Sequence, residues 1–155
     1  MNLPAEDPLA AELYPPPWMV LSSMALCLVG LVIDSYLTFE HYTGNSSLVC
    51  SDKGLINCGK VTTSVYSKLL GIPVADLGVA FFLGMLVLCL PAAWRAANLR
   101  IHQLRLLGVV VSMLMVLYLL YGELRLRAIC LYCTATHVVA FLLFIVVLAA
   151  DTYVR

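Results

Sequence analysis

Four of the six cysteines in the chain are spaced so that they could exchange electrons as pairs. Cys130 and Cys133 stand at the head of an apolar run that continues to Ala150. A C-x-x-C pair at a helix start exchanges readily with disulfides, because the positive end of the helix dipole favours a thiolate. Cys50 and Cys58 form a second pair in the only long polar stretch. Two such pairs predict that electrons pass from one to the other and then into a lipid-soluble acceptor.

The surroundings of the C-x-x-C pair favour a reactive thiol over a packing role. Arg125 and Arg127 lie just upstream and add positive charge to the helix start. Cys133 lies one turn deeper than Cys130, so we expect Cys133 to meet a ligand in the bilayer and Cys130 to meet the aqueous loop.

Two other interpretations of these cysteines stay open at this point. The loop pair, Cys50 and Cys58, could close a purely structural disulfide in a four-span scaffold protein, which would leave the C-x-x-C pair unexplained. The four thiols could also hold zinc. A bundle held together by lipid has no structural need for a metal, and we therefore expect none.

The composition identifies the environment in which this chemistry takes place. The chain has 155 residues, of which 63% are hydrophobic and 12% are charged, and its mean hydropathy is +0.98. Soluble domains contain about 45–50% apolar and about 25% charged residues. The sequence therefore predicts an integral membrane protein of one domain. A formal net charge of zero gives no indication of a nucleic-acid partner.

Four apolar segments are long enough to cross a bilayer as helices, which needs about 20 residues each. They cover residues 18–39, 74–93, 104–121 and 128–150. We expect an all-α membrane protein, a four-transmembrane-helix bundle over residues 18–150. Residues 1–17 are acidic and proline-rich and lack the basic start of a signal peptide, so we expect a disordered leader. Residues 151–155 form a short tail.

The connection between the first two spans, residues 40–73, carries the loop cysteines. Within it, residues 61–70 place Val61, Val65 and Leu69 near one helical face, which predicts a short amphipathic helix at the membrane interface. Pro73 suits the first turn of the second span. The triplet that begins at Asn45 is a glycosylation sequon, a pattern that is common by chance.

An even number of spans places both termini on one side of the membrane and both cysteine pairs on the other. The short second loop carries Arg95 and Arg100, which favours a cytoplasmic position for that loop. Persistent disulfides belong outside the cytoplasm. We therefore expect the cysteine-bearing loop in the periplasm, the extracellular space or an equivalent lumen, and both termini in the cytoplasm.

The ordered motifs resemble the vitamin K epoxide reductase family on its bacterial side. They are Cys50, residues 57–61 (Asn-Cys-Gly-Lys-Val), Ser64, residues 71–78 (Gly-Ile-Pro-Val-Ala-Asp-Leu-Gly) and the C-x-x-C pair. The resemblance covers nearly the whole chain, from about Trp18 to Ala150. It implies a four-helix bundle around a quinone with a capping loop, in the inner membrane of a bacterium.

The resemblance also implies a role for each matching residue. Cys133 matches the cysteine that reacts with the quinone, and Cys130 matches its partner, which exchanges with the loop. Cys58 matches the cysteine that attacks Cys130, and Cys50 matches the one that takes electrons from a thioredoxin-fold carrier. Ser64 matches a serine or threonine of the interfacial helix. The quinone would be of the ubiquinone, menaquinone or vitamin K type, and the carrier a separate protein.

Two departures from the animal enzymes bear on the reaction. Val74 or a near neighbour stands where those enzymes carry an asparagine that bonds the quinone, and His137 replaces their tyrosine. Both departures favour oxidation of a disulfide carrier with quinone reduction, which supports disulfide formation, over epoxide reduction proper. His137 lies one turn below Cys133 and could bond a quinone oxygen or supply a proton.

Two carboxylates and two further cysteines lie within the apolar spans. Asp76 is near the expected cysteine face and could serve the site, and Asp34 could face a polar interior near a helix end. Cys27 and Cys89 are expected to be buried and inert.

Overall fold

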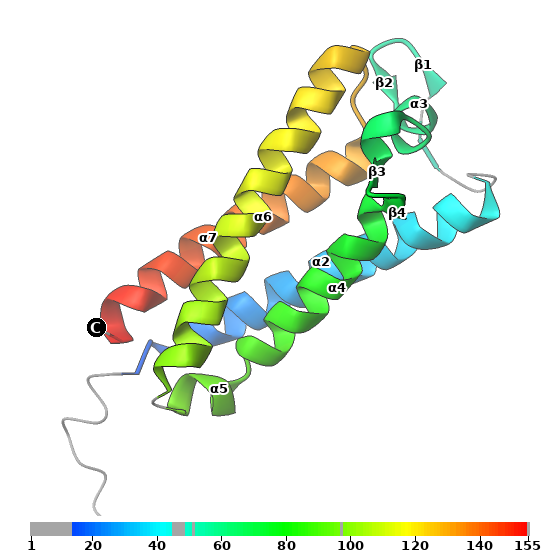
Figure 1. The fold of residues 1–155 in the computed structure, drawn as a ribbon. Coiled ribbons are helices and arrows are strands. Elements are labelled where there is room, and N and C mark those ends of the chain that lie inside the picture. Colours follow the sequence, from blue (N-terminus) through cyan, green and yellow to red (C-terminus); the bar gives the residue numbers. More distant parts are fainter. Residues whose placement is uncertain (1–13, 45–48, 51, 97, 155) are drawn as a thin grey trace, which may run out of the picture.

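The computed structural model describes residues 14–44, 49–50, 52–96 and 98–154. Its four main helices form a bundle, and they are α2 (Pro17–Thr43), α4 (Val74–Leu88), α6 (Leu99–Leu126) and α7 (Leu131–Val154) (Figure 1). α2 packs against α4 and α7, and α6 packs against both of these helices. The predicted all-α four-helix bundle with a cysteine-bearing loop is confirmed.

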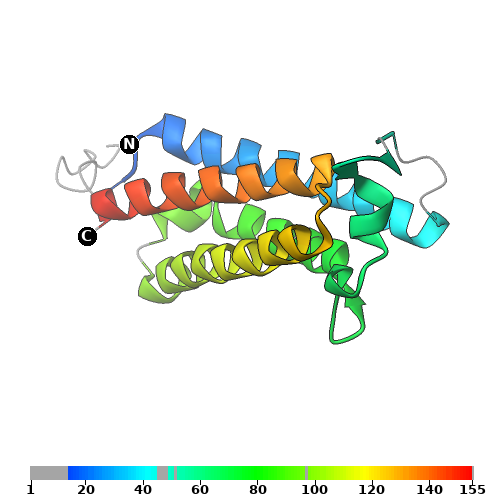
Figure 2. The ribbon, with the colours of Figure 1, turned by 90° about the horizontal axis from the view of Figure 1, so that it is seen from above.

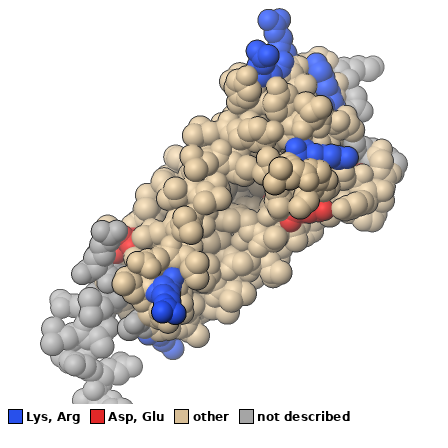
Figure 3. All heavy atoms as spheres, viewed as in Figure 1, with Lys and Arg blue, Asp and Glu red and all other residues tan. Residues whose placement is uncertain are grey.

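The outer surface of the bundle is suited to lipid. Three helices, α2, α6 and α7, are long and apolar enough to cross a membrane. Large apolar side chains such as Leu21, Leu114 and Phe141 are exposed on them. On the face drawn in Figure 3, charged side chains gather toward the two ends and leave a broad uncharged belt between them. The chain is a multi-pass integral membrane protein.

The second helix is shorter than the predicted span of residues 74–93. α4 ends at Leu88, and α5 (Pro91–Arg95) follows after a break. Pro91 causes the break, because its ring disfavours a helical conformation at the residue before it. Leu90 is accordingly extended, with φ −58° and ψ 146°. At 1.5 Å per residue, α4 spans roughly 22 Å, less than a hydrocarbon core of about 30 Å.

The other helices are longer than their apolar segments indicated. α6 begins at Leu99 and not at residue 104, because Asn98 caps it: the Asn98 side-chain oxygen accepts the Arg100 N–H at 3.0 Å. α2 and α7 each extend about one turn past the predicted ends at residues 39 and 150. Polar residues at these ends can stay helical once they lie at the membrane surface.

The loop between α2 and α4 contains short elements instead of one amphipathic helix. Two hairpins, β1 (Asp52–Lys53) with β2 (Ile56–Asn57) and β3 (Lys68–Leu69) with β4 (Ile72–Pro73), flank α3 (Cys58–Thr62) and a 3₁₀ turn. Of the predicted short helix at residues 61–70, only the end of α3 and the 3₁₀ turn (Val65–Ser67) are helical. Residues 68–73 instead reverse direction at Leu70 and Gly71, which both have positive φ.

The start of α2 and the end of α7 lie at one end of the bundle, and the loop lies at the other (Figure 2). The turn between α6 and α7 is beside the loop (Figure 1). This confirms that the two predicted cysteine pairs share one face. Of the leader predicted over residues 1–17, the structure describes Tyr14 and the buried Pro15, which pack at the opposite end, and Pro16 and Pro17 at the start of α2. The rest of that leader, residues 1–13, and the sequon at residues 45–47 lie outside the described residues.

Candidate functional site

The loop cysteines are brought together by the first hairpin. β1 and β2 are antiparallel, with Asp52 opposite Asn57, so the residues just before and just after the hairpin lie side by side. Gly54 has φ +75° and permits the tight turn. Cys50 and Cys58 form a disulfide across this base, with their Cα atoms 6.0 Å apart.

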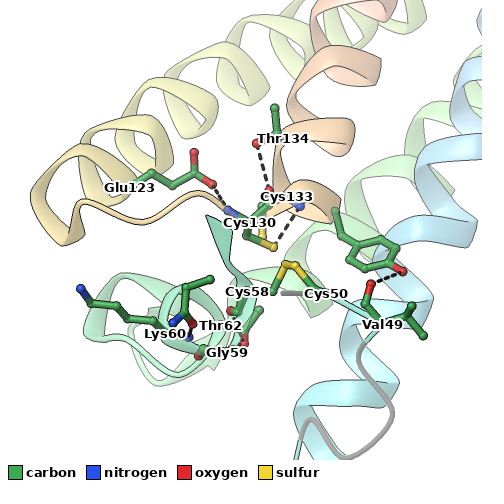
Figure 4. Close-up of a disulfide and its surroundings, with 12 residues drawn as sticks. Val49, Cys50, Cys58, Gly59, Lys60, Thr62, Glu123, Cys130, Cys133 and Thr134 are labelled. Atoms are coloured by element: carbon green, nitrogen blue, oxygen red, sulfur yellow. Dashed lines mark hydrogen bonds between the residues drawn. A yellow bond between two sulfur atoms is a disulfide. The ribbon is translucent and has the colours of Figure 1, made fainter. Parts of the chain in front are cut away.

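The loop is attached directly to the chain that leads into α7. The Asn57 N–H donates to the Ile129 carbonyl at 3.0 Å, and the Ile129 N–H donates to the Leu55 carbonyl at 2.8 Å. Because Asn57 precedes Cys58 and Ile129 precedes Cys130, these bonds hold the two cysteines beside each other. Figure 4 shows the disulfide on the side of the loop that faces the sulfur of Cys130.

Two side chains reinforce this attachment. Lys60 Nζ donates to the Leu126 carbonyl at 2.7 Å, at the C-terminal end of α6, where a cation is favoured by the helix dipole. The Tyr132 hydroxyl donates to the Val49 carbonyl at 3.3 Å, beside Cys50. The loop is thus bonded to the end of α6 and to the first turn of α7, on either side of Cys130.

Cys130 lies immediately before the first residue of α7 and acts there as a cap. The Cys133 N–H donates to Cys130 Sγ at 3.3 Å, in the manner of an N-cap side chain. The Cys133 thiol lowers the pKa of the Cys130 thiol. The backbone N–H groups of Cys133 and Tyr132 lower that pKa further. Burial and the Glu123 carboxylate act in the opposite direction. Cys130 and Cys133 are free thiols in this structure.

Glu123 is a residue of this site that the sequence analysis did not identify. Its carboxylate is buried, 7% exposed, and accepts the Cys130 N–H at 3.3 Å (Figure 4). The predicted end of the third span at residue 121 assigned Glu123 to a surface turn. An acidic residue inside a helix that enters a bilayer is the signal that could have identified it.

A cavity of about 370 Å³ opens between the four helices below the C-x-x-C motif. Most of its walls are apolar, and Cys133, His137 and Val74 are among the residues that line it. The other polar groups at its surface include Asp34, Thr136, Ser112 and Glu123. Its size and apolar character are those of pockets that bind small organic molecules.

His137 is the polar side chain in the cavity wall that most clearly lacks an internal partner. It is 6% exposed, and neither ring nitrogen has a hydrogen-bond partner among the described residues. A buried polar group without a partner indicates a ligand or water that would complete it. This is the position at which a bound molecule with a carbonyl or hydroxyl oxygen would find a hydrogen bond.

Asp34 has a defined place in the wall, where three helices meet. Its Oδ1 accepts the Thr136 hydroxyl of α7 at 3.0 Å. A methyl group at Gly78 of α4 would overlap the Asp34 carboxylate, so only glycine permits this close approach. The carboxylate, 3% exposed, is therefore held at the cavity by both neighbouring helices.

Two of the predicted supporting residues lie elsewhere. The Ser64 hydroxyl donates to the Val61 carbonyl at 2.8 Å within the loop, and Ser64 does not line the cavity. Asp76 Oδ2 accepts the Tyr42 hydroxyl at 2.7 Å, which ties the end of α2 to the start of α4 outside the cavity lining. The structure thus brings Cys133, Val74 and His137 together and leaves Ser64 and Asp76 apart from them.

No group of three or more His, Cys, Asp or Glu side chains able to hold a metal ion occurs among the described residues.

Comparison with known protein families identifies a family for most of the chain. The model of the vitamin K epoxide reductase family matches residues 21–148, which include the cysteine-bearing loop, the C-x-x-C motif and most of the four-helix bundle.

Proposed function

The chain belongs to the vitamin K epoxide reductase family, and from this we propose that it is a membrane enzyme that passes electrons from a thioredoxin-fold disulfide carrier to a quinone. Loop and helix cysteine pairs in a membrane oxidoreductase imply thiol–disulfide chemistry. The carrier, the quinone and the direction of electron flow are the parts of this proposal that go beyond the family.

The observation that carries the proposal is the order of accessibility along the four sulfur atoms. Cys50, at the outer surface, is partly exposed. Cys58 and Cys130, the two that face each other, are both 0% exposed. Cys133 is again partly exposed, and it lines the cavity. A protein carrier can therefore reach only the first sulfur and a ligand in the cavity only the last, while the middle two exchange with each other.

The steps follow from thiol–disulfide exchange. A carrier thiolate attacks Cys50 and releases Cys58, and the second carrier thiol then displaces Cys50, so the carrier leaves oxidised. Cys58 attacks Cys130 in a Cys130–Cys133 disulfide and releases Cys133. Cys50 attacks Cys58, which re-forms the loop disulfide and frees Cys130. Two electrons have then moved from the carrier to the inner pair.

In the second half, Cys130 and Cys133 return to a disulfide and give two electrons to the acceptor in the cavity. The two thiol protons balance the two protons that the acceptor oxygens gain. A loop disulfide with free Cys130 and Cys133 is the state just before this step. The lowered pKa of Cys130 supports it, because a thiolate at Cys130 can attack Cys133 once Cys133 has engaged the acceptor.

The cavity suits a quinone. Its apolar walls match a lipid-soluble ring, and the free ring nitrogens of His137 offer a hydrogen bond to a carbonyl oxygen. A quinone supplies two-electron acceptor chemistry when bound. Val74, which is at or near the position that matches the animal asparagine, lines the cavity but has no side-chain donor. This supports quinone reduction over epoxide reduction proper.

We propose that the cysteine face is periplasmic or extracellular and that both termini are cytoplasmic, in a bacterial inner membrane. The exposed Arg95 and Arg100 lie at the end of the bundle that holds the termini, which supports a cytoplasmic position for that end. The carrier would then meet Cys50 in the compartment where disulfides persist.

Quinone reduction by the purified protein in detergent tests the proposal. A reduced thioredoxin-fold carrier supplies electrons, a soluble quinone accepts them, and quinone absorbance is followed, with Cys133→Ala beside the wild type. We expect carrier-dependent reduction that Cys133→Ala abolishes. No reduction by the wild type with several quinones, even with dithiothreitol in place of the carrier, would refute the proposal and favour a scaffold with a structural loop disulfide. A vitamin K epoxide offered in parallel separates the epoxide reductase alternative.

A further inference from the structure

The two cysteines outside the relay lie together at the opposite end of the bundle. Cys27 comes from α2 and Cys89 is the C-terminal cap of α4, and both are 0% exposed. Both belong to one buried core cluster, in which their thiols lie next to each other. The sequence analysis treated each as an isolated, inert thiol. The structure instead places them as a pair between two helices.

A buried cation lies beside this pair. Arg105 of α6 is 2% exposed and lies beside the Cys89 thiol. Its guanidinium donates to the Leu88 carbonyl at 2.7 Å and lies 3.4 Å from the centre of the Trp94 ring. Among the described residues, no carboxylate forms an ion pair with Arg105.

This environment differs from that of an inert core cysteine. A buried guanidinium without a carboxylate favours a negative charge on the group next to it, and that group is the Cys89 sulfur. Ser23, whose hydroxyl donates to the Val20 carbonyl at 2.8 Å, also lies beside Cys89. Cys27 is then placed as a resolving thiol, in contact with the sulfur that would react first.

We propose that Cys27 and Cys89 are a third redox-active pair, which a small hydroperoxide oxidises to a disulfide between α2 and α4. Burial determines which oxidant can react. Neither cysteine is exposed, so a protein disulfide cannot reach the sulfur atoms. A small uncharged molecule can enter the helix interface when the structure opens locally. The proposal does not depend on the quinone relay, which uses the other four cysteines.

The reaction balances without another reagent. The Cys89 thiolate attacks the terminal peroxide oxygen and the O–O bond breaks, which gives a sulfenic acid at Cys89 and, with one proton, an alcohol or water. The Cys27 sulfur then attacks Cys89, the S–O bond breaks, and hydroxide leaves with the Cys27 proton as water. Two thiols and one hydroperoxide thus give one disulfide, one alcohol or water, and one water. A dithiol reverses the disulfide by exchange.

Hydrogen peroxide with mass spectrometry of the full-length protein in detergent tests the proposal. After exposure to peroxide, the protein is denatured, alkylated and digested without reduction. We expect Cys27 and Cys89 to lose reactivity together, to appear as one intrachain linked peptide pair, and to be restored by dithiothreitol. In Cys27→Ser, dimedone should label Cys89, whereas in Cys89→Ser it should leave Cys27 unlabelled.

The role of the cation is tested by a matched pair of charge changes. Arg105→Gln should slow peroxide oxidation of the pair roughly tenfold by loss of thiolate, whereas Arg95→Gln, an exposed cation nearby, should leave the rate unchanged. The proposal is overturned if both thiols remain alkylatable while Cys133 in the same sample is oxidised. The proposal is also overturned if dimedone fails to label Cys89 in Cys27→Ser. This second test does not use an Arg105 variant, so it holds even if Arg105→Gln misfolds.

Discussion

At one end of the bundle, cysteines lie in a loop and at a helix start, and at the other end they lie between helices. Backbone bonds at Asn57 and Ile129 hold the loop pair against Cys130. Cys27 and Cys89 are held by side-chain packing around Arg105 instead. Access to the sulfur atoms, and not the mere presence of a thiol pair, therefore decides which reagent each cysteine pair can meet.

The largest expected effect is on quinone reduction, and it should differ between the two ends of the bundle. Cys130→Ala should lower carrier-dependent quinone reduction by about 10³-fold or more, because the proposed relay would lose the sulfur that connects the loop to the cavity. Cys89→Ser lies outside the relay, and its rate should stay within about twofold of wild type, as for substitutions remote from a site. Comparable losses in both variants would show that the two ends are not independent.

A second prediction compares two glycines on which neighbouring helices close in. A methyl group at Gly30 would overlap the Phe82 ring, and one at Gly78 would overlap the Asp34 carboxylate. Each Gly→Ala change should lower the free energy of unfolding by about 1–3 kcal/mol through overpacking. Unfolding in mixed micelles with increasing denaturing detergent measures this.

Gly84 provides the matched control for those two changes. It lies on an exposed face of α4, with no atom within 4 Å of an added methyl group. Gly84→Ala should therefore raise stability by about 0.5–1 kcal/mol through helix propensity. A loss at Gly84 equal to that at Gly30 or Gly78 would contradict the packing explanation.

A smaller effect should appear only at the loop end. Asn57 Oδ1 accepts the Lys60 N–H at 2.8 Å and caps α3, so Asn57→Ala should cost about 1 kcal/mol of local stability. Hydrogen exchange of the α3 amides measures it, and Asn57→Asp, which keeps the capping oxygen, should exchange like wild type. Faster exchange at the Arg105 end of the bundle would show that the ends are coupled.

The smallest effect is a shift in a titration midpoint with the fold intact. In a Cys50→Ala, Cys58→Ala background, the rate of Cys130 alkylation should rise with pH as the thiolate forms. Adding Cys133→Ala should move the midpoint up, because the thiol that lowers the Cys130 pKa is gone. Glu123→Gln should move it down, because the neutral amide removes a charge that raises that pKa. Shifts in the same direction would contradict this account of Cys130.

The four-helix bundle and its cysteine-bearing loop could be predicted from the sequence because their signals are local. Apolar runs mark the membrane segments, and a C-x-x-C pair is visible in four residues. Helix ends depended on single residues that hydropathy ignores, such as Asn98 as a cap and Pro91 as a breaker. Local chemistry therefore determines the boundaries, even where composition determines the fold.

Contacts between helices could not be predicted in the same way. Glu123 and Cys130 meet through the turn between α6 and α7, and Cys27 meets Cys89 only because α2 packs against the end of α4. When all faces of a helix are apolar, periodicity does not reveal which side chains face each other. Sequence alone therefore predicted Cys27 and Cys89 as two separate thiols.

The pairing of Asn57 with Ile129 also has a consequence for biosynthesis. A ribosome makes the loop well before it makes Ile129, so the loop has no docking strand until the last helix emerges. Cys50 and Cys58 are close in sequence and can already be oxidised together during that interval, whereas Cys130 does not yet exist. Synthesis from the N-terminus thus favours the correct loop disulfide over a mispaired bond to the C-x-x-C motif.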